Sequence, residues 1–189
     1  MKIGLTGSHG TGKTSVAEAV VEDEWFKDRN WKFVPSTSAL AVKEGYKINR
    51  EANPLDQLVV TCSRIAAEYR ADDGECSLIT DRTLVDSLAY TTYQFNNVWE
   101  YGGTEFYYKT SFTLVEKQMQ EYDKVFYFPV HWNPKTRKDG NRDPDAGYQR
   151  DIDSHIATYL EILEVPIIVM PNASVAERVD FIKANILVD

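Results

Sequence analysis

The sequence has 189 residues, 43% of them hydrophobic, and a formal net charge of −8. No stretch approaches the roughly 18 consecutive apolar residues of a membrane span, and the acidic balance argues against broad adhesion to duplex DNA or anionic membranes. Cys62 and Cys76 are too few for a disulfide framework and lack metal-ligand spacing, so we expect reduced thiols and, without a signal peptide, a cytoplasmic location.

Strand-like and helix-like patterns alternate along the chain. Short apolar runs predict strands at residues 3–6, 32–35, 77–80, 124–128 and 166–170. Apolar steps of three and four, or capping residues, predict helices at residues 15–20, 36–42, 55–69, 85–95, 105–121, 148–163 and 174–186. This order predicts a three-layer α/β fold, in which a five-stranded parallel sheet carries helices on both faces and binds ligands at its carboxyl edge. The length favours a single domain over residues 1–189.

The first loop carries the most specific motif of the chain. Residues 7–14 read GSHGTGKT and fit the phosphate-binding loop pattern G-x-x-x-x-G-K-[ST], between a strand and a helix. Glycines let several backbone N–H groups converge on a phosphate at the helix N-terminus. The Lys13 ammonium would lie at the β- and γ-phosphates of ATP, and the Thr14 hydroxyl would bind Mg²⁺. The residues expected to bind ATP here are Gly7, His9, Gly10, Thr11, Gly12, Lys13, Thr14 and Ser15.

A second polar motif, Asp81-Arg82, follows the third predicted strand, at the sheet edge where the phosphate-binding loop also lies. An acidic residue there can hold Mg²⁺ or orient an attacking oxygen, and an arginine can bridge transferring phosphates. We therefore expect Asp81 to be a metal ligand and catalytic residue, and Arg82 to be a catalytic residue. The alternative is that Asp81 only caps the following helix.

A polar segment after the fourth predicted strand has no apolar periodicity. It covers about residues 130–147 and is rich in Pro, Gly, Asp, Lys and Arg. It is too long for a plain connection in a compact chain, so we expect a functional lid. Its cations could stabilise the charge of a transferring phosphate and exclude water on closing. The alternative is a solvated loop, because nearby aspartates offset part of that charge.

Together these motifs resemble those of a known superfamily. Asp81-Arg82, followed by Asp86-Ser87, Ala89-Tyr90 and Gln94, is similar to the third-strand motif of thymidylate kinases and related P-loop nucleoside and nucleotide kinases. Residues 139–142, which read DGNR, are similar to the lid of the nicotinamide-riboside-kinase-like and phage-type deoxynucleotide kinase branch.

The resemblance implies roles for residues outside the two motifs. Members of this superfamily use ATP and Mg²⁺, and a homodimer is compatible with the resemblance. Lid cations would close over the transferring phosphate, with Arg142 as a catalytic residue and Arg137 at ATP; Lys138 and Arg150 are further candidates. Asn172 would lie in the turn that wraps the adenine of ATP. Arg64, on the long helix after the second strand, would contact the acceptor.

The acceptor is less well defined than the donor. Many members of the superfamily carry a carboxylate after the second strand, where it can accept a proton from a hydroxyl, but here residues 36–38 read Ser-Thr-Ser. A phosphate acceptor is already ionised and needs no base, so the sequence favours a nucleoside monophosphate, although Asp81 could act as base for a hydroxyl. The aromatic residues at 90, 93, 95, 99, 101 and 106–108 would either stack on the acceptor base or pack in the core.

Three functions are compatible with these patterns. The first is ATP- and Mg²⁺-dependent transfer of a phosphoryl group to a (deoxy)nucleoside monophosphate. The second is the same chemistry with a hydroxyl acceptor, on a nucleoside, nicotinamide riboside or a hydroxymethylated base, so DNA is not excluded as a partner; no membrane partner is expected. The third, a regulatory NTPase, would need D-x-x-G and [NT]-K-x-D elements, and neither occurs in the sequence.

Overall fold

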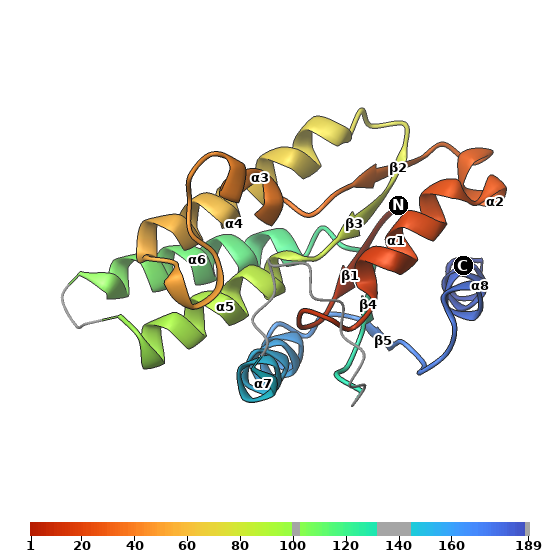
Figure 1. Ribbon diagram of the computed structural model, residues 1–189. Helices are drawn as coiled ribbons and strands as arrows, with labels where there is room; N and C mark the ends of the chain where they lie inside the picture. The colour runs from red at the N-terminus through yellow and green to blue at the C-terminus, as the bar shows by residue number, and fades with distance from the viewer. Residues whose placement is uncertain (100–102, 132–144, 188–189) are drawn as a thin grey trace.

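A parallel sheet runs through the centre of the molecule (Figure 1). The computed structural model describes residues 1–99, 103–131 and 145–187. Within them the sheet has five strands in the order β2-β3-β1-β4-β5, and each neighbouring pair is parallel. The strands are β1 (Lys2–Thr6), β2 (Trp31–Val34), β3 (Ser77–Asp81), β4 (Lys124–Tyr127) and β5 (Ile167–Val169).

Helices alternate with these strands, as the sequence predicts. They are α1 (Lys13–Glu22), α2 (Glu24–Lys27), α3 (Ser38–Lys43), the 3₁₀ helix η1 (Asn49–Glu51), α4 (Pro54–Ala71), α5 (Leu84–Asn97), α6 (Thr104–Met119), α7 (Ala146–Ile162) and α8 (Val175–Ile186). The sequence analysis did not predict α2 and η1, because elements of four and three residues are too short to show a period. The helix predicted over residues 36–42 starts later in the structure, with Thr37 as the N-cap of α3.

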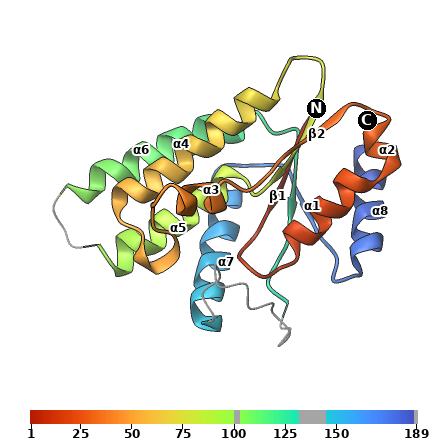
Figure 2. The same ribbon diagram turned by 45° about the horizontal axis from the view of Figure 1, so that its top comes forward.

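The two faces of the sheet are covered by different helices. On one face, Ile3 and Leu5 of β1 pack with residues of α1 and α8, which lie side by side in Figures 1 and 2. On the other face, Val125 of β4 packs with residues of α5, α6 and α7. Side chains alternate between the faces along a strand, so the fold is the predicted three-layer α/β arrangement. No helix in the described ranges is long and apolar enough to span a bilayer.

Glycine in the middle of β1 brings the start of α5 close to the sheet. A Cβ atom built on Gly4 would clash with Cγ2 of Thr83 and lie 2.9 Å from the Tyr122 ring, so a larger residue would push α5 away. In the β1–β3 ladder Leu5 pairs with Asp81. Because parallel strands end at the same edge, the loop after β1 and the turn after β3 are neighbours there.

Candidate functional site

The loop between β1 and α1 curls through three glycines. Gly7, Gly10 and Gly12 have φ angles of 145°, 79° and 93°, values that residues with a side chain rarely adopt. A Cβ atom on Gly7 would also clash with the backbone oxygen of Phe128, so this position requires glycine. Helix α1 begins at Lys13, directly after the curled segment, so its first N–H groups are available for an anion.

Lys13 lies inside this loop. Its Nζ atom donates hydrogen bonds to the backbone oxygens of Gly7 and Ser8, both at 2.5 Å, and to Oγ1 of Thr11 at 3.1 Å. Burial, together with the positive charge of Arg82, lowers the pKa of Lys13 from 10.5 to about 7. A polyphosphate in the loop would favour the charged ammonium and raise this pKa again.

This pKa predicts that ATP binding is coupled to proton uptake. At pH 8, above the pKa of about 7, most of the free protein carries a neutral Lys13, and binding should take up a fraction of a proton. At pH 6 Lys13 is already charged, so that uptake should disappear. Calorimetric titrations in two buffers of different ionisation enthalpy measure the proton number. The control is Lys13→Arg, because a guanidinium keeps its charge throughout this pH range; equal uptake in that variant would contradict the assignment to Lys13.

Thr14 and Asp81 face each other across the loop and the end of β3. The Thr14 hydroxyl donates to Oδ2 of Asp81 at 3.1 Å. Asp81 is buried, and its Oδ1 atom has no hydrogen-bond partner among the described residues. A hydroxyl and a carboxylate with an unused oxygen suit Mg²⁺, which prefers oxygen ligands, so these residues fit the metal that the sequence motif implies. The alternative role for Asp81 is wrong, because Thr83 is the N-cap residue of α5.

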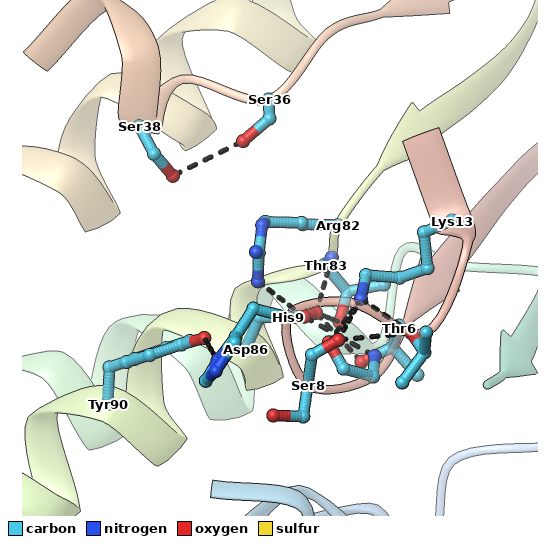
Figure 3. Close-up of polar contacts among 12 residues, drawn as sticks. Thr6, Ser8, His9, Lys13, Ser36, Ser38, Arg82, Thr83, Asp86 and Tyr90 are labelled. Carbon is cyan, nitrogen blue, oxygen red and sulfur yellow. Dashed lines mark hydrogen bonds and ion pairs between the residues drawn. The ribbon is translucent and has the colours of Figure 1, made fainter. Parts of the chain in front are cut away.

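Arg82 occupies an unusual backbone conformation beside Asp81. Its φ angle is 81°, which is uncommon for a residue other than glycine. Its guanidinium forms an ion pair with Asp86, with 3.2 Å between Nη1 and Oδ1. Burial disfavours the charge of this side chain, but Tyr90, Asp86 and Asp81 together raise the pKa of Arg82, so it stays positive. The structure thus brings Lys13, Asp81 and Arg82 to one edge of the sheet. Figure 3 shows the Lys13 and Arg82 side chains of this group.

Asp86 joins the phosphate-binding loop to this turn. It is 1% exposed, and it accepts hydrogen bonds from Oγ1 of Thr6 at 2.8 Å, from the Gly7 N–H at 3.3 Å and from the Thr83 N–H at 2.9 Å (Figure 3). We assigned no role to Asp86 from the sequence. Its position three residues after the N-cap Thr83 is a signal for a helix cap, but the contacts with Thr6 and Gly7 depend on the fold.

Residues of α5 and α7 support the loop at Ser8 and His9. His9 is 6% exposed and lines the cavity described below, and its Nδ1 atom lies 3.0 Å from the Tyr90 hydroxyl. Gln149 donates from Nε2 to the His9 carbonyl at 2.5 Å, and its backbone carbonyl accepts from the Ser8 hydroxyl at 3.0 Å. Sequence reasoning missed Gln149, because residues so far apart in the chain meet only in the folded protein.

A cavity of about 390 Å³ opens beside the loop. One side is formed by His9, Thr14, Asp81 and Arg82, and the other by residues that follow β2 and by α3, η1 and α4. Figure 3 shows Ser36 and Ser38, whose hydroxyl oxygens lie 3.2 Å apart, across the cavity from Arg82. Further lining residues are Glu18, Phe33, Gln57, Val60, Ser87 and Tyr90.

Only some of the residues suggested for the acceptor line the cavity, and one of them, Tyr101, lies outside the described residues. Of the predicted aromatic residues, Tyr90 lines the cavity, whereas Tyr93 packs on Tyr148 and Phe95 stacks on Tyr108. Arg64, suggested for the acceptor, is buried and does not line the cavity, and it donates to the Asp81 carbonyl.

At the other end of the loop, Arg178 of α8 links two segments. Its Nη1 donates to the Thr11 carbonyl and its Nε to the Pro171 carbonyl, both at 3.1 Å. Asn172, suggested for adenine binding, is exposed in this turn, and Ser15 is exposed on α1. Arg150 is exposed on α7. The lid candidates Arg137, Lys138 and Arg142 lie outside the described residues.

Comparisons with known proteins place this geometry in context. A protein-family model described as an AAA domain matches residues 2–178. The fold is similar to that of deoxyadenosine kinase from M. mycoides, whose structure holds dCMP and dCDP, with a TM-score of 0.67, 16% identity and coverage of 99% of this chain and 98% of that one. It is also similar to thymidylate kinase from Candida albicans, with a TM-score of 0.67, 11% identity and coverage of 98% and 90%.

Thymidylate kinase from Ehrlichia chaffeensis has the same fold, with a TM-score of 0.64, 14% identity and 98% coverage of both chains. A search of curated proteins found no significant sequence match. The fold expected from the resemblance to P-loop nucleoside and nucleotide kinases is thereby confirmed.

Proposed function

Because the chain belongs to the AAA-domain family and has the fold of P-loop nucleoside and nucleotide kinases, we propose that it transfers the γ-phosphoryl group of ATP to a (deoxy)nucleoside monophosphate. The observation that carries this proposal is the position of the cavity. It opens beside the phosphate-binding loop, and Thr14, Asp81 and Arg82 stand at its boundary. A donor in the loop and an acceptor in the cavity would meet at these three side chains.

On the donor side, the curled loop and the N-terminus of α1 would bind the β- and γ-phosphates. The Lys13 ammonium already lies inside the loop, where it donates to two backbone oxygens, and it would turn these donors toward the bound phosphates. Thr14 and Asp81 would hold Mg²⁺, which supplies charge neutralisation at the phosphate oxygens. Oδ1 of Asp81 has no hydrogen-bond partner among the described residues, which supports its assignment as a Mg²⁺ ligand.

On the acceptor side, the attacking oxygen would belong to the monophosphate. It would form a bond to the γ-phosphorus as the bond from that phosphorus to the β–γ bridging oxygen breaks and ADP leaves. Such transfer depends on positioning and electrostatic stabilisation. Arg82 lines the cavity next to Asp81 and would contact the negative oxygens that move. After β2, Ser36 and Ser38 lie across the cavity where a carboxylate could act as a base for a hydroxyl acceptor, and a serine hydroxyl cannot take that role.

An acceptor panel tests the proposal. Purified protein with ATP and Mg²⁺ is offered nucleoside monophosphates, nucleosides, nicotinamide riboside and duplex DNA with a hydroxymethylated base, and product formation is measured. We expect turnover with one or more monophosphates. Turnover only with a hydroxyl acceptor would overturn the acceptor assignment, and ATP binding without transfer to any of them would overturn the kinase assignment.

Arg82 provides a prediction specific to the transfer step. Replacing it with methionine should lower kcat by roughly 100-fold, by analogy with the loss of one donor that stabilises transition-state charge, while the Kd for ATP changes little. The control is Arg29→Met, because Arg29 is an exposed residue remote from the cavity. A pure loss of ATP binding, with kcat retained at saturation, would contradict a role of Arg82 in transfer.

A further inference from the structure

We propose that Arg64 is a positioning residue that aims Asp81 and Arg82 by holding the peptide group between them. This inference rests on the proposed function, because it concerns the side chains that would meet Mg²⁺ and the transferring phosphate. Arg64 lies in the middle of α4, is 2% exposed and does not line the cavity. Because it is buried and does not line the cavity, we infer that it acts through the residues it contacts.

The peptide between Asp81 and Arg82 is held at both of its polar atoms. Nη2 of Arg64 donates to the Asp81 carbonyl at 2.7 Å, and the Arg82 N–H donates to the Leu5 carbonyl at 3.0 Å. The first is a charge-assisted hydrogen bond in a buried place, which is stronger and more directional than one between neutral groups. Together the two bonds determine how this peptide is rotated relative to β1.

The rotation of this peptide matters because the backbone here is strained. Arg82 has a φ angle of 81°, and a residue with a side chain in this region costs on the order of 1–3 kcal/mol unless its surroundings hold it. The side chains on either side of the peptide point to functional partners. Asp81 Oδ2 lies 3.1 Å from the Thr14 hydroxyl, and Arg82 Nη1 lies 3.2 Å from Asp86. Relaxation of the turn would displace both side chains together.

The nearby carboxylate of Glu68 does not pair with the buried Arg64 guanidinium. Glu68, one turn further along α4, is bound instead to Lys2 at 2.5 Å and to the Tyr122 hydroxyl at 2.6 Å. Nη1 of Arg64 has no hydrogen-bond partner among the described residues. Burial of such a charge is unfavourable, and an apolar side chain would fill the same space at lower cost. The bond to the Asp81 carbonyl is the contact that an apolar side chain could not provide.

The test compares Arg64→Met with Arg64→Lys, which keeps a charged donor. ATP binding is measured by calorimetry with Mg²⁺ and with EDTA, and turnover is measured with the acceptor identified in the panel. In Arg64→Met, binding in EDTA should stay close to the wild-type value, while the gain in affinity from Mg²⁺ and kcat should each fall by about 10- to 100-fold, as for residues that orient metal ligands. Arg64→Lys should recover much of that loss. Arg70→Met is the matched control, since Arg70 is exposed on the same helix.

A purely structural role gives a different result. In that case Arg64→Met would lower Tm and leave the Mg²⁺ dependence of ATP binding close to that of the wild type, and the inference would be overturned. If the methionine variant does not fold, Arg64→Gln, which keeps a neutral donor, is held to the same criterion. The Mg²⁺ dependence of ATP binding is measurable without any acceptor, so failure of the proposed kinase activity is distinguishable from failure of this inference.

Discussion

Replacement of Lys13 with alanine is expected to abolish detectable phosphoryl transfer while the protein remains folded. The Lys13 ammonium lies inside the phosphate-binding loop, and its removal takes away the positive charge closest to the β- and γ-phosphates. Loss of one preorganised group of this kind lowers kcat by roughly 100- to 1000-fold or more. Tm should not fall substantially, because the side chain that is removed is a buried charge rather than an apolar residue that fills the core.

Steady-state kinetics and thermal unfolding of the same preparation check this prediction. Lys27→Ala is a suitable control, because Lys27 is an exposed lysine on α2 and lies away from the loop. The control should have wild-type turnover. Unchanged turnover in Lys13→Ala would rule out the proposed mechanism, whereas a protein that no longer folds would show that Lys13 is needed for the loop itself.

The second large effect is expected at Asp86. In Asp86→Asn the side chain keeps its shape but loses its charge and one acceptor oxygen. The half-buried Arg82 guanidinium then loses its ion-pair partner, and the buried amide group would face N–H and O–H donors from Thr6, Gly7 and Thr83. Hydrogen bonds to a buried charged group contribute about 1.5–3 kcal/mol each. We expect a loss of stability of that order, together with weaker ATP binding, because Asp86 also holds the start of the loop.

The chain offers a matched control for this variant. Asp56 occupies the same position in the capping box of α4, three residues after Asn53, and is also buried, but its carboxylate binds the N–H of Asn53 rather than the phosphate-binding loop. Asp56→Asn should therefore cost only about 1 kcal/mol, the usual value of a helix cap, and leave ATP binding intact. Urea unfolding and calorimetry of both variants separate capping from tertiary contacts. Equal losses in the two variants would show that Asp86 acts only as a cap.

The sequence predicted those parts of the site whose conformation depends on residues close together in the chain. The phosphate-binding loop is one such case, because a strand, three glycines with positive φ and a helix that begins at Lys13 follow one another directly. The predicted helix start at Ser174 is also local, since its hydroxyl accepts from the N–H group three residues further on. The sequence likewise placed Asp81 and Arg82 at the carboxyl edge, because β3 ends there.

Other features of the site depend on segments that are distant in the chain. Arg64 sits on a helix whose sequence pattern does not show how deeply that position is buried; only the packing of α4 against the sheet places its guanidinium at the Asp81 carbonyl. Gln149 reaches the His9 carbonyl from α7, and Arg178 reaches Thr11 from α8. Periodicity identifies the buried face of a helix, but it does not identify the backbone atoms that this face will meet.

The sequence alone determined that this chain would form a parallel α/β sheet with a phosphate-binding loop after its first strand, because hydrophobic period and glycine conformation act over a few neighbouring residues. The strand order β2-β3-β1-β4-β5 and the packing of α4, α5 and α7 were decided by the tertiary structure. Those contacts turned Asp86 from a helix cap into the link between Thr6 and Arg82, and they made Arg64 a buried donor to the Asp81 carbonyl. Such roles arise from distances between residues far apart in the chain, which only the folded protein brings within hydrogen-bond range.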